Sequence, residues 1–156
     1  MEKPLTQHIL SNRPPLNLKD YRAVGGYESV RKALQMKPQD IVQQIKDSGL
    51  QGRGGGGFNT GMKWSFVPMN GTEGPKYLIA NADEMEPGTF KDRLLLEGNP
   101  HQLIEGMIVS AYALQANISY IFLRWAYKKA ARLIIHAIAE AYANGYLGKN
   151  ILGSEF

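Results

Sequence analysis

Apolar residues recur at the spacing of an α-helix in two long segments of the second half of the chain. Segment 100–116, "PHQLIEGMIVSAYALQA", carries a single apolar stripe and predicts a core helix. That stripe consists of Leu103, Ile104, Met107, Ile108, Ala111 and Leu114. Segment 126–145, "AYKKAARLIIHAIAEAYANG", predicts a second amphipathic helix, which ends at Gly145 because glycine is the usual helix terminator.

Two shorter apolar runs alternate with these helices. The stretch "KYLIANADE" predicts a short buried strand over residues 77–79, which leads into an acidic turn. The stretch "SYIFLR", residues 119–124, predicts a second short strand. The order strand, helix, strand, helix favours parallel pairing with a right-handed crossover. We therefore expect an α/β domain with a parallel, Rossmann-like sheet.

The amino-terminal part of the chain has a different pattern, with a polar start followed by short helical stretches. Pro38 suits the first turn of a helix, Ile41 and Val42 follow at helical spacing, and "DSGL" supplies the stop. This helix leads directly into a glycine-rich stretch. We expect a helical entry segment over residues 1–50 and one α/β domain over residues 51–156.

The glycine-rich stretch "QGRGGGGFNTGMKW", residues 51–64, packs six glycines into ten positions. It fits G-x-G-x-x-G, but the preceding segment has a helical period and the dinucleotide fingerprint needs a strand there. It also fits G-x-x-x-x-G, but Lys63 comes one position too late for a P-loop. A flexible linker is the alternative, although Phe58, Lys63 and Trp64 are unusual in linkers. We expect an anion-binding loop in which uncovered backbone N–H groups and Lys63 balance a phosphate.

A second cluster of polar residues, "NADEMEPGTFKDR", follows the first predicted strand. Asn81, Asp83, Glu84 and Glu86 lie within one turn, at the carboxyl end of a strand, where open parallel sheets bind ligands. Carboxylates and an asparagine can accept hydrogen bonds from hydroxyls and ring N–H groups, but they repel phosphate. A solvated acidic turn is the alternative. Together, the two clusters predict a phosphate loop beside a turn that binds hydroxyls and a ring.

Composition limits the possible classes of protein. With 156 residues, 44% of them hydrophobic, the chain can form one domain with a core. The net charge of +4 comes from scattered basic residues, so it favours an anionic ligand and gives no support for nucleic acid. No apolar stretch approaches the roughly 20 residues of a membrane span, and the start "MEKPLTQHIL" lacks signal-peptide features. We expect a cytoplasmic location.

Metal and hydrolase chemistry find no support in the sequence. The chain has no cysteine, which excludes disulfides and thiolate metal sites within it. His8, His101 and His136 are far apart and have no partners at metal-ligand spacing, so no metal is assigned. His136 lies among isoleucines and is expected to be partly buried packing. No nucleophile elbow is present. Trp64 and Phe66 can belong either to the core or to a ligand wall.

Both polar clusters together resemble a known family. "GRGGGGFNTGMKW" followed by "NADEMEPGTFKDRLLLEGNPHQLIEGM" is similar to the flavin- and NADH-binding F subunits of respiratory complex I, the NADH-quinone oxidoreductase. The likeness runs over essentially the whole chain, from "PLTQHI" to "LGKNILGS". The flavin subunits of NAD-linked formate dehydrogenases and hydrogenases share the same motifs. The resemblance implies an oxidoreductase subunit that transfers a hydride from NADH to FMN, with FMN carrying the chemistry.

The resemblance also implies roles for particular residues. It places FMN against six residues of the two clusters, namely Gly54, Gly55, Lys63, Asn81, Asp83 and Glu84. It implies that Phe58 and Phe66 stack on the adenine of NADH, and that Glu86 lies near the nicotinamide. An aromatic face is what a base needs, so the assignment is chemically consistent. No side chain is expected to act as a catalytic acid or base.

The chain also departs from the family pattern. Family members typically have glycine and glutamate where Trp125 and Ala126 stand here, and a tryptophan just after a strand is expected to alter local packing. They are also longer, with a second flavin-contacting segment and four cysteines for a 4Fe–4S cluster. The chain therefore resembles the amino-terminal portion of such a subunit, with an incomplete FMN domain. The alternatives are a formate dehydrogenase or hydrogenase flavin subunit, or an inactive binding or assembly fragment.

The resemblance further implies partners and a place in the cell. It implies NADH as substrate, and the E-type and G-type subunits of the complex I peripheral arm as protein partners. It places the complex on the cytoplasmic face of the bacterial inner membrane, with this subunit peripheral to it and not inserted.

Overall fold

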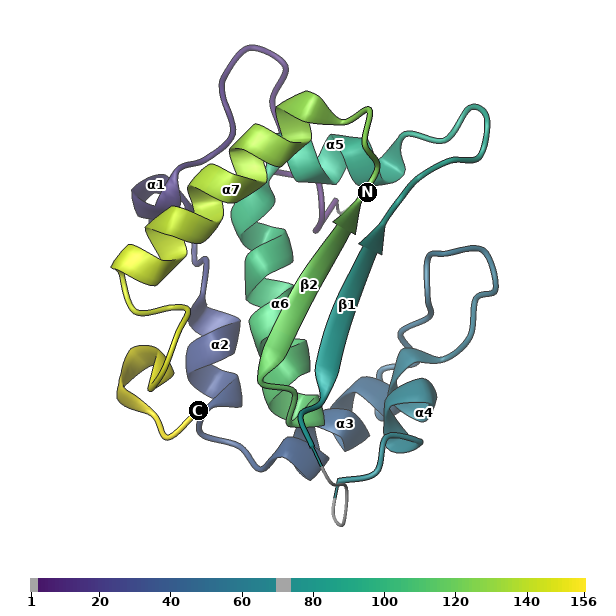
Figure 1. Ribbon diagram of the computed structural model, residues 1–156, viewed down its shortest axis with the longest axis vertical. Helices are drawn as coiled ribbons and strands as arrows, with labels where there is room; N and C mark the ends of the chain where they lie inside the picture. The colour runs from purple at the N-terminus through teal and green to yellow at the C-terminus, as the bar shows by residue number, and fades with distance from the viewer. Residues whose placement is uncertain (1–2, 70–73) are drawn as a thin grey trace.

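A computed structural model describes residues 3–69 and 74–156 (Figure 1). Its elements, in chain order, are α1 (Leu18–Ala23), α2 (Glu28–Ala33), α3 (Pro38–Asp47), α4 (Thr60–Ser65), β1 (Tyr77–Ala82), α5 (Lys91–Gly98), α6 (Pro100–Leu114), β2 (Ile118–Leu123), α7 (Lys128–Ala143) and the short 3-10 helix η1 (Ile151–Gly153). The helix predicted from Pro38 and both long helices of the second half are confirmed as α3, α6 and α7. Within the described ranges, no helix is both long and apolar enough to cross a membrane.

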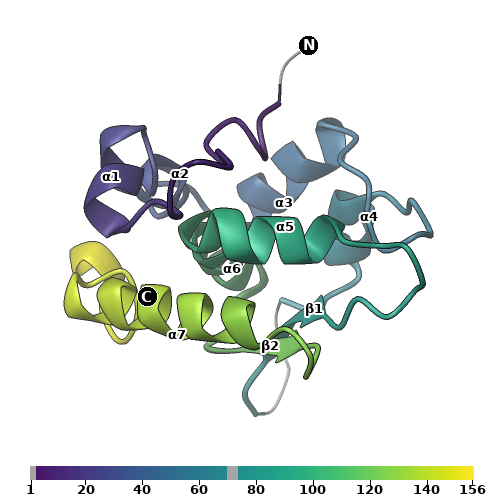
Figure 2. The same ribbon diagram turned by 90° about the horizontal axis from the view of Figure 1, so that it is seen from above.

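The two strands form a parallel sheet, as the alternation of elements predicts. Tyr77 stands opposite Ile118 at one end of the ladder, and Ala82 stands opposite Leu123 at the other. Helices α5 and α6 connect the strands behind the sheet, and the crossover is right-handed in Figure 1. Seen from above in Figure 2, helices α5, α6 and α7 all lie on one side of the sheet. The α/β fold with parallel strands is confirmed.

The opposite face of the sheet is apolar and exposed. Tyr77 and Ile79 of β1 are 55% and 63% exposed, and Tyr120 and Phe122 of β2 are exposed to a similar degree. The rings of Tyr77 and Tyr120 stack with their centroids 6.2 Å apart. The prediction of a buried first strand is therefore wrong for this face, because the described helices cover only the other one.

The main core lies between the entry segment and the long helices. Tyr27 and Val30, at the start of and within α2, are fully buried and share one cluster with Ile104 and Ile108 of α6 and with Ala137 of α7. The amino-terminal helices are thus packed onto the α/β part rather than hanging from it. This packing fixes the position of α3, which leads into the glycine-rich stretch.

A buried polar network reinforces this contact. His101, on α6, is completely buried, with its Nδ1 2.9 Å from the Tyr27 hydroxyl and its Nε2 3.1 Å from the Glu140 carboxylate. Glu105, one turn further along α6, accepts hydrogen bonds from the Tyr21 hydroxyl and the Ser29 backbone. Burial lowers the pKa of His101, although Glu140 opposes the shift. The network therefore holds a neutral imidazole at neutral pH.

The expectation that His136 is partly buried is wrong. Its side chain is 73% exposed and lies 3.7 Å from Glu140 at the surface of α7. Ile134, two residues earlier, is the residue that turns into the core. Because α7 packs through a narrow stripe, a shift of two positions along a helix is enough to move a side chain from the core to the surface.

Candidate functional site

The glycine-rich stretch forms a closed loop with an open rim. Its ends are joined by an antiparallel bridge between Gln51 and Asn59 and by a 2.8 Å hydrogen bond from the Gly52 N–H to the Phe58 carbonyl. At the tip, Gly55 has a φ of +111°, which disfavours any other residue. A Cβ atom placed on Gly54, Gly55 or Gly56 would meet no protein atom within 4 Å. Packing therefore does not require glycine at these three positions, whereas the backbone conformation does at Gly55.

The last glycine of the stretch has a different role. A Cβ atom on Gly61 would clash with the backbone nitrogen of Lys46, so α4 can pack on α3 only because this position lacks a side chain. Asn59 caps α4 by accepting a 2.8 Å hydrogen bond from the Met62 N–H. These two contacts fix the direction in which α4 leaves the loop. Lys63 is consequently presented on the exposed side of α4.

Two aromatic residues predicted to stack on adenine come together at the surface. Phe58 at the end of the loop is 55% exposed, and Phe66 at the end of α4 is 68% exposed. Their ring centroids are 6.4 Å apart, with an angle of 44° between the planes. Phe66 is therefore not a core residue. Trp64, two residues before Phe66, is partly buried and packs against the core cluster that contains Ile41.

The four polar residues of the acidic cluster are divided between the surface and the interior, and Asn81 lies in β1 rather than in the turn that follows it. Asn81 is exposed, and its Oδ1 accepts a 3.0 Å hydrogen bond from the Asp83 N–H, which bends the chain after β1. Glu86 is exposed, and among the described residues no hydrogen bond or ion pair engages its carboxylate. Glu84 is only 3% exposed. The buried Glu84 carboxylate is thus separated from the exposed side chains of Asn81 and Glu86.

The Glu84 carboxylate is held by the start of α5 and by a tyrosine. Its two oxygens accept hydrogen bonds from the N–H groups of Asp92 (3.1 Å) and Arg93 (3.2 Å), and one of them also accepts from the Tyr127 hydroxyl at 3.1 Å. Burial alone would raise the pKa of Glu84, but these hydrogen bonds and the charge of Lys91 lower it below its usual value. The carboxylate is therefore ionised and satisfied at neutral pH.

Residues after β2 complete the support of this turn. The Arg124 guanidinium donates a hydrogen bond to the Glu84 carbonyl and lies 5.5 Å from the centre of the Tyr127 ring. Arg124 and Tyr127 were not expected from the sequence to take part. The available signal was their position, since Arg124 ends the second predicted strand and Tyr127 lies three residues beyond it. Because both strand ends meet at one edge of a parallel sheet, residues about forty positions apart in sequence come to hold one turn.

Trp125 does not disturb this arrangement. Its side chain is 86% exposed, and the Lys128 ammonium lies over its ring. The expected effect on local packing is therefore absent, because the indole points into solvent instead of toward β2.

Figures 1 and 2 both place the glycine loop and the acidic turn on the same side of the molecule, beyond β1. The loop and α4, which carry Phe58, Lys63 and Phe66, thus lie on the same side of the molecule as the acidic turn. Within the part of the chain that the structure describes, no group of three or more histidine, cysteine, aspartate or glutamate residues is placed to hold a metal ion.

Comparison with known proteins decides the family. The profile of the Nuo51 FMN-binding domain matches residues 45–153. The chain belongs to this family. It is 54% identical, over 98% of its own length, to the F subunit of NADH-quinone oxidoreductase of Escherichia coli (strain K12), and 58% identical, over 89% of its length, to the F 2 subunit of the same enzyme of Rhizobium meliloti (strain 1021). It spans 35% and 33% of these two proteins, about a third of each.

Solved structures agree with this family assignment. An NAD+-reducing NiFe hydrogenase in its air-oxidised state is 36% identical, with a TM-score of 0.68, over 84% of this chain and 23% of that one. The same class of enzyme in its hydrogen-reduced state matches 92% of this chain with a TM-score of 0.67. The family and its relatives are oxidoreductase components, and the two bacterial F subunits belong to a multisubunit NADH-quinone oxidoreductase. The identity to the E. coli protein exceeds that to the hydrogenase.

Proposed function

We propose that this chain forms the FMN-binding part of an NADH-quinone oxidoreductase subunit, in which a hydride passes from NADH to FMN. The observation that carries the proposal is the glycine loop, whose tip positions have no protein neighbour that would exclude a side chain. A ligand that approaches the backbone closely explains glycines that packing does not. The exposed Lys63 and the exposed aromatic pair beside the loop suit a phosphate and a nucleotide base.

The residues present fit FMN. Gly54 and Gly55 would leave their N–H groups open to the phosphate, and Lys63 would offset its charge. Asn81 and Asp83 would accept hydrogen bonds from ribityl hydroxyls or ring N–H groups. Glu84 would act through the turn, because both of its oxygens are already bonded to the protein. Its role is thus to fix where Asn81 and Asp83 point.

Bound FMN would supply the hydride acceptor that no side chain can provide. The chain's own residues would bind and orient NADH. Phe58 and Phe66 would stack on its adenine, since both rings are exposed and adjacent. Glu86 would lie near the nicotinamide and repel the additional phosphate of NADPH, because its carboxylate has no partner among the described residues.

The same proposal extends to the assembly. In the complex, the E-type and G-type subunits would be the partners, at the cytoplasmic face of the bacterial inner membrane. The names of the E. coli and R. meliloti relatives support membership of a complex. A 4Fe–4S cluster would need ligands from elsewhere in a longer chain, since this chain has no cysteine.

Two alternative functions are each supported by one observation. The structural match to the NAD+-reducing hydrogenase favours a hydrogenase-linked flavin protein. However, the identity to that enzyme is lower than the identity to the E. coli F subunit. A binding or assembly fragment without turnover is favoured by the third of the relatives' length that this chain spans.

One experiment separates turnover from binding alone. The purified chain is loaded with FMN, and NADH is added without oxygen while the flavin absorbance is recorded. Loss of the oxidised flavin absorbance on addition of NADH supports hydride transfer. Retention of FMN without bleaching supports the binding fragment, and absence of FMN binding contradicts both.

A further inference from the structure

A buried histidine links the entry segment to the two long helices of the fold. His101 lies at the start of α6 and is completely buried. Its ring stacks on that of Tyr21 from α1, with centroids 5.7 Å apart, and its Nδ1 lies 2.9 Å from the hydroxyl of Tyr27, the residue that precedes α2. Its Nε2 lies 3.1 Å from the Glu140 carboxylate on α7. The proposed flavin chemistry uses none of these four residues.

The partners of the imidazole assign the position of its proton. A carboxylate oxygen only accepts hydrogen bonds, so the Nε2 of His101 carries the proton and donates to Glu140. Nδ1 is then the acceptor, and the Tyr27 hydroxyl donates to it. Burial raises the pKa of Tyr27, so this hydroxyl keeps its proton. The neutral imidazole with hydrogen on Nε2 therefore satisfies both of its partners.

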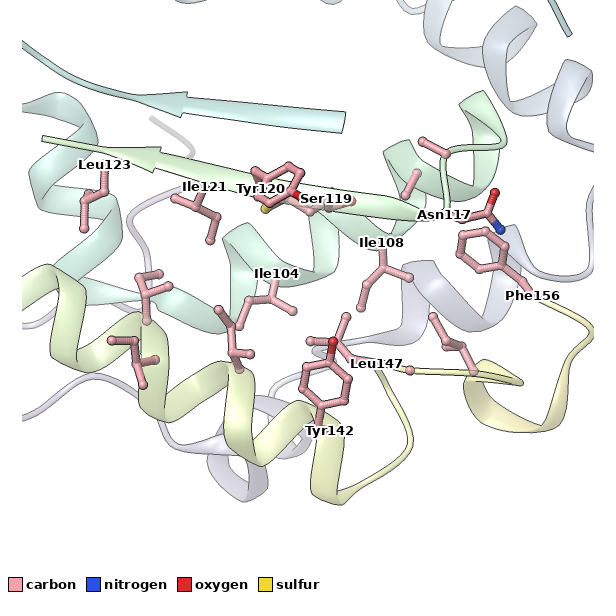
Figure 3. A pocket seen from close by; sticks show the side chains of 18 of the residues that line it. Ile104, Ile108, Asn117, Ser119, Tyr120, Ile121, Leu123, Tyr142, Leu147 and Phe156 are labelled. Carbon is pink, nitrogen blue, oxygen red and sulfur yellow. The ribbon is translucent and has the colours of Figure 1, made fainter. Parts of the chain in front are cut away.

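A second proton on His101 would break this match. Nδ1 would become a donor, and the Tyr27 hydroxyl would have to turn and accept from it. Within the described residues this hydroxyl has no other hydrogen-bond partner, so its own hydrogen would be buried without an acceptor. Further along the same stripe of α6, Ile104 and Ile108 line an apolar cavity of about 510 Å³ (Figure 3), and their side chains offer no polar group. The surroundings of the ring thus suit the neutral form.

The other titratable groups that face His101 come from α1, α6 and α7. On α7, Glu140 favours the charged imidazole, whereas His136, 3.7 Å from the same carboxylate, opposes it. On α6, Glu105 is engaged by the hydroxyl of Tyr21 from α1. Burial has the largest effect, and it lowers the pKa of His101. The folded chain therefore resists a proton that an exposed histidine would take up near its ordinary value of 6.5.

We propose that His101 is an acid-sensitive clasp, which holds α1 and α2 against α6 and α7 while it is neutral and weakens this attachment when it takes up a proton. Apolar contacts of the entry segment, such as those of Val30 in the cluster with Ile104, do not titrate, so acid loosens the attachment without abolishing it. Flavin binding plays no part in the clasp.

The direction of the pH dependence follows from the two states of the clasp. When the entry segment opens, His101 is exposed and binds a proton near pH 6.5, whereas the closed form binds it only at lower pH. The stabilisation is therefore complete above about pH 6.5 and is lost progressively as the pH falls below it.

Two measurements on the purified chain test the clasp. The Cε1–H NMR signal of His101 gives its pKa, which we expect below 6.5. Amide hydrogen exchange over residues 18–33, divided at each pH by the intrinsic exchange rate, gives the opening constant of α1 and α2. We expect this constant to be flat above about pH 7 and to rise toward about pH 5, by at most about tenfold per pH unit, the limit for one proton.

Matched variants assign the effect to one residue. His101→Gln removes the titrating ring and should make the opening constant independent of pH in this range. His136→Gln removes the exposed histidine beside the same carboxylate and should leave most of the rise intact. Glu140→Gln keeps an acceptor for Nε2 but removes the charge that favours the proton, so the rise should extend to lower pH.

Three results would overturn the proposal. The first is an opening constant in the parent that does not change with pH. The second is a rise that persists in His101→Gln, which would assign the effect to Glu105, the other titratable group buried in the network. Should His101→Gln not fold, the parent and Glu140→Gln decide. The third result is then an NMR pKa of His101 at its ordinary value, or the same opening profile in both proteins.

Discussion

The acidic turn and the glycine loop lie on the same side of the molecule but are built in opposite ways. In the turn, the Glu84 carboxylate has its hydrogen bonds satisfied by α5 and Tyr127. At the tip of the loop, Gly54, Gly55 and Gly56 have no protein neighbour at their Cβ positions. The turn is therefore explained by contacts within the chain and Gly55 by its positive φ, whereas Gly54 and Gly56 have no such explanation.

The contrast separates residues that serve the fold from residues that are available to a ligand. A charged group whose hydrogen bonds are complete contributes to stability, and its loss costs the desolvation of its partners. An open glycine without a positive φ, such as Gly54, contributes nothing to packing, and its replacement affects only what approaches the backbone from outside. Stability and ligand affinity should therefore respond to different substitutions in the two regions.

The largest effect is expected at Glu84. Glu84→Ala leaves two backbone N–H groups and the Tyr127 hydroxyl without their acceptor, which is predicted to lower the free energy of unfolding by about 3 kcal/mol. Glu86→Ala, in the same turn but exposed, is the control and should stay within about 0.5 kcal/mol of the parent. Urea denaturation measures both. Equal stability of the two variants would contradict the division of the turn.

The contribution of Glu84 also depends on pH. Its pKa in the folded chain is lowered by hydrogen bonds from α5 and Tyr127, so the stabilisation is present above the ordinary value of 4.5 and is lost as the pH falls through the folded pKa. The stability gap between the parent and Glu84→Gln is predicted to be constant near neutral pH and to narrow in acid. Denaturation midpoints measured across this range provide the test. A gap that persists in strong acid would refute the assigned cause.

Two glycines test the loop in the same way. Gly61→Val forces a side chain against the Lys46 backbone and is predicted to destabilise the fold by about 2 kcal/mol or more. Gly54→Val has open space and should change stability by less than about 0.5 kcal/mol. Thermal unfolding of both variants is the measurement. A strongly destabilised Gly54 variant would mean that the tip serves the fold.

The aromatic pair offers a prediction of intermediate size. Phe58→Ala is predicted to weaken NADH binding to the FMN-loaded chain by about 1–3 kcal/mol, as for bases that stack on other aromatic residues, with FMN affinity unchanged. Phe122→Ala is the matched control, because Phe122 is 58% exposed on the sheet face and Phe58 is 55% exposed. Calorimetric titration with NADH compares them. Equal NADH affinities would remove Phe58 from the proposed site.

The smallest effect is expected at Glu86. Glu86→Gln keeps the shape and removes the charge, so NADPH should bind better relative to NADH. Because the carboxylate is exposed, the gain is limited to about 1 kcal/mol, or roughly fivefold in the ratio of dissociation constants. Titrations with both nucleotides give this ratio. A ratio equal to that of the parent would show that Glu86 does not sense the nucleotide.

The long elements were predictable from sequence because periodicity decides them. Helices α6 and α7 carry apolar stripes over four turns or more, and α3 has a proline start. The short helices α4 and α5, with six and eight residues, were missed because no long stripe marks them. Periodicity also cannot tell which face of a helix meets a partner, and so His136, expected to be partly buried, lies at the surface while His101 is buried.

The candidate site was predictable in composition but not in arrangement. Sequence placed Asn81, Asp83, Glu84 and Glu86 in one turn; the last three do follow β1, but Asn81 belongs to the strand itself. It did not separate Glu84 from the others, because the separation comes from Tyr127 and Arg124 after the other strand. Likewise, Phe66 could be assigned to the surface only once α4 had been positioned on α3 through Gly61.

The central claim is that the open glycine loop binds the phosphate of FMN. The most direct measurement is a fluorescence titration of the purified chain with FMN and with riboflavin, which lacks the phosphate, for the parent and for Gly54→Val. The parent is predicted to bind FMN more tightly than riboflavin, and Gly54→Val should lose this preference while keeping its stability. Equal affinity of the parent for the two flavins, or an unchanged preference in Gly54→Val, would contradict the claim.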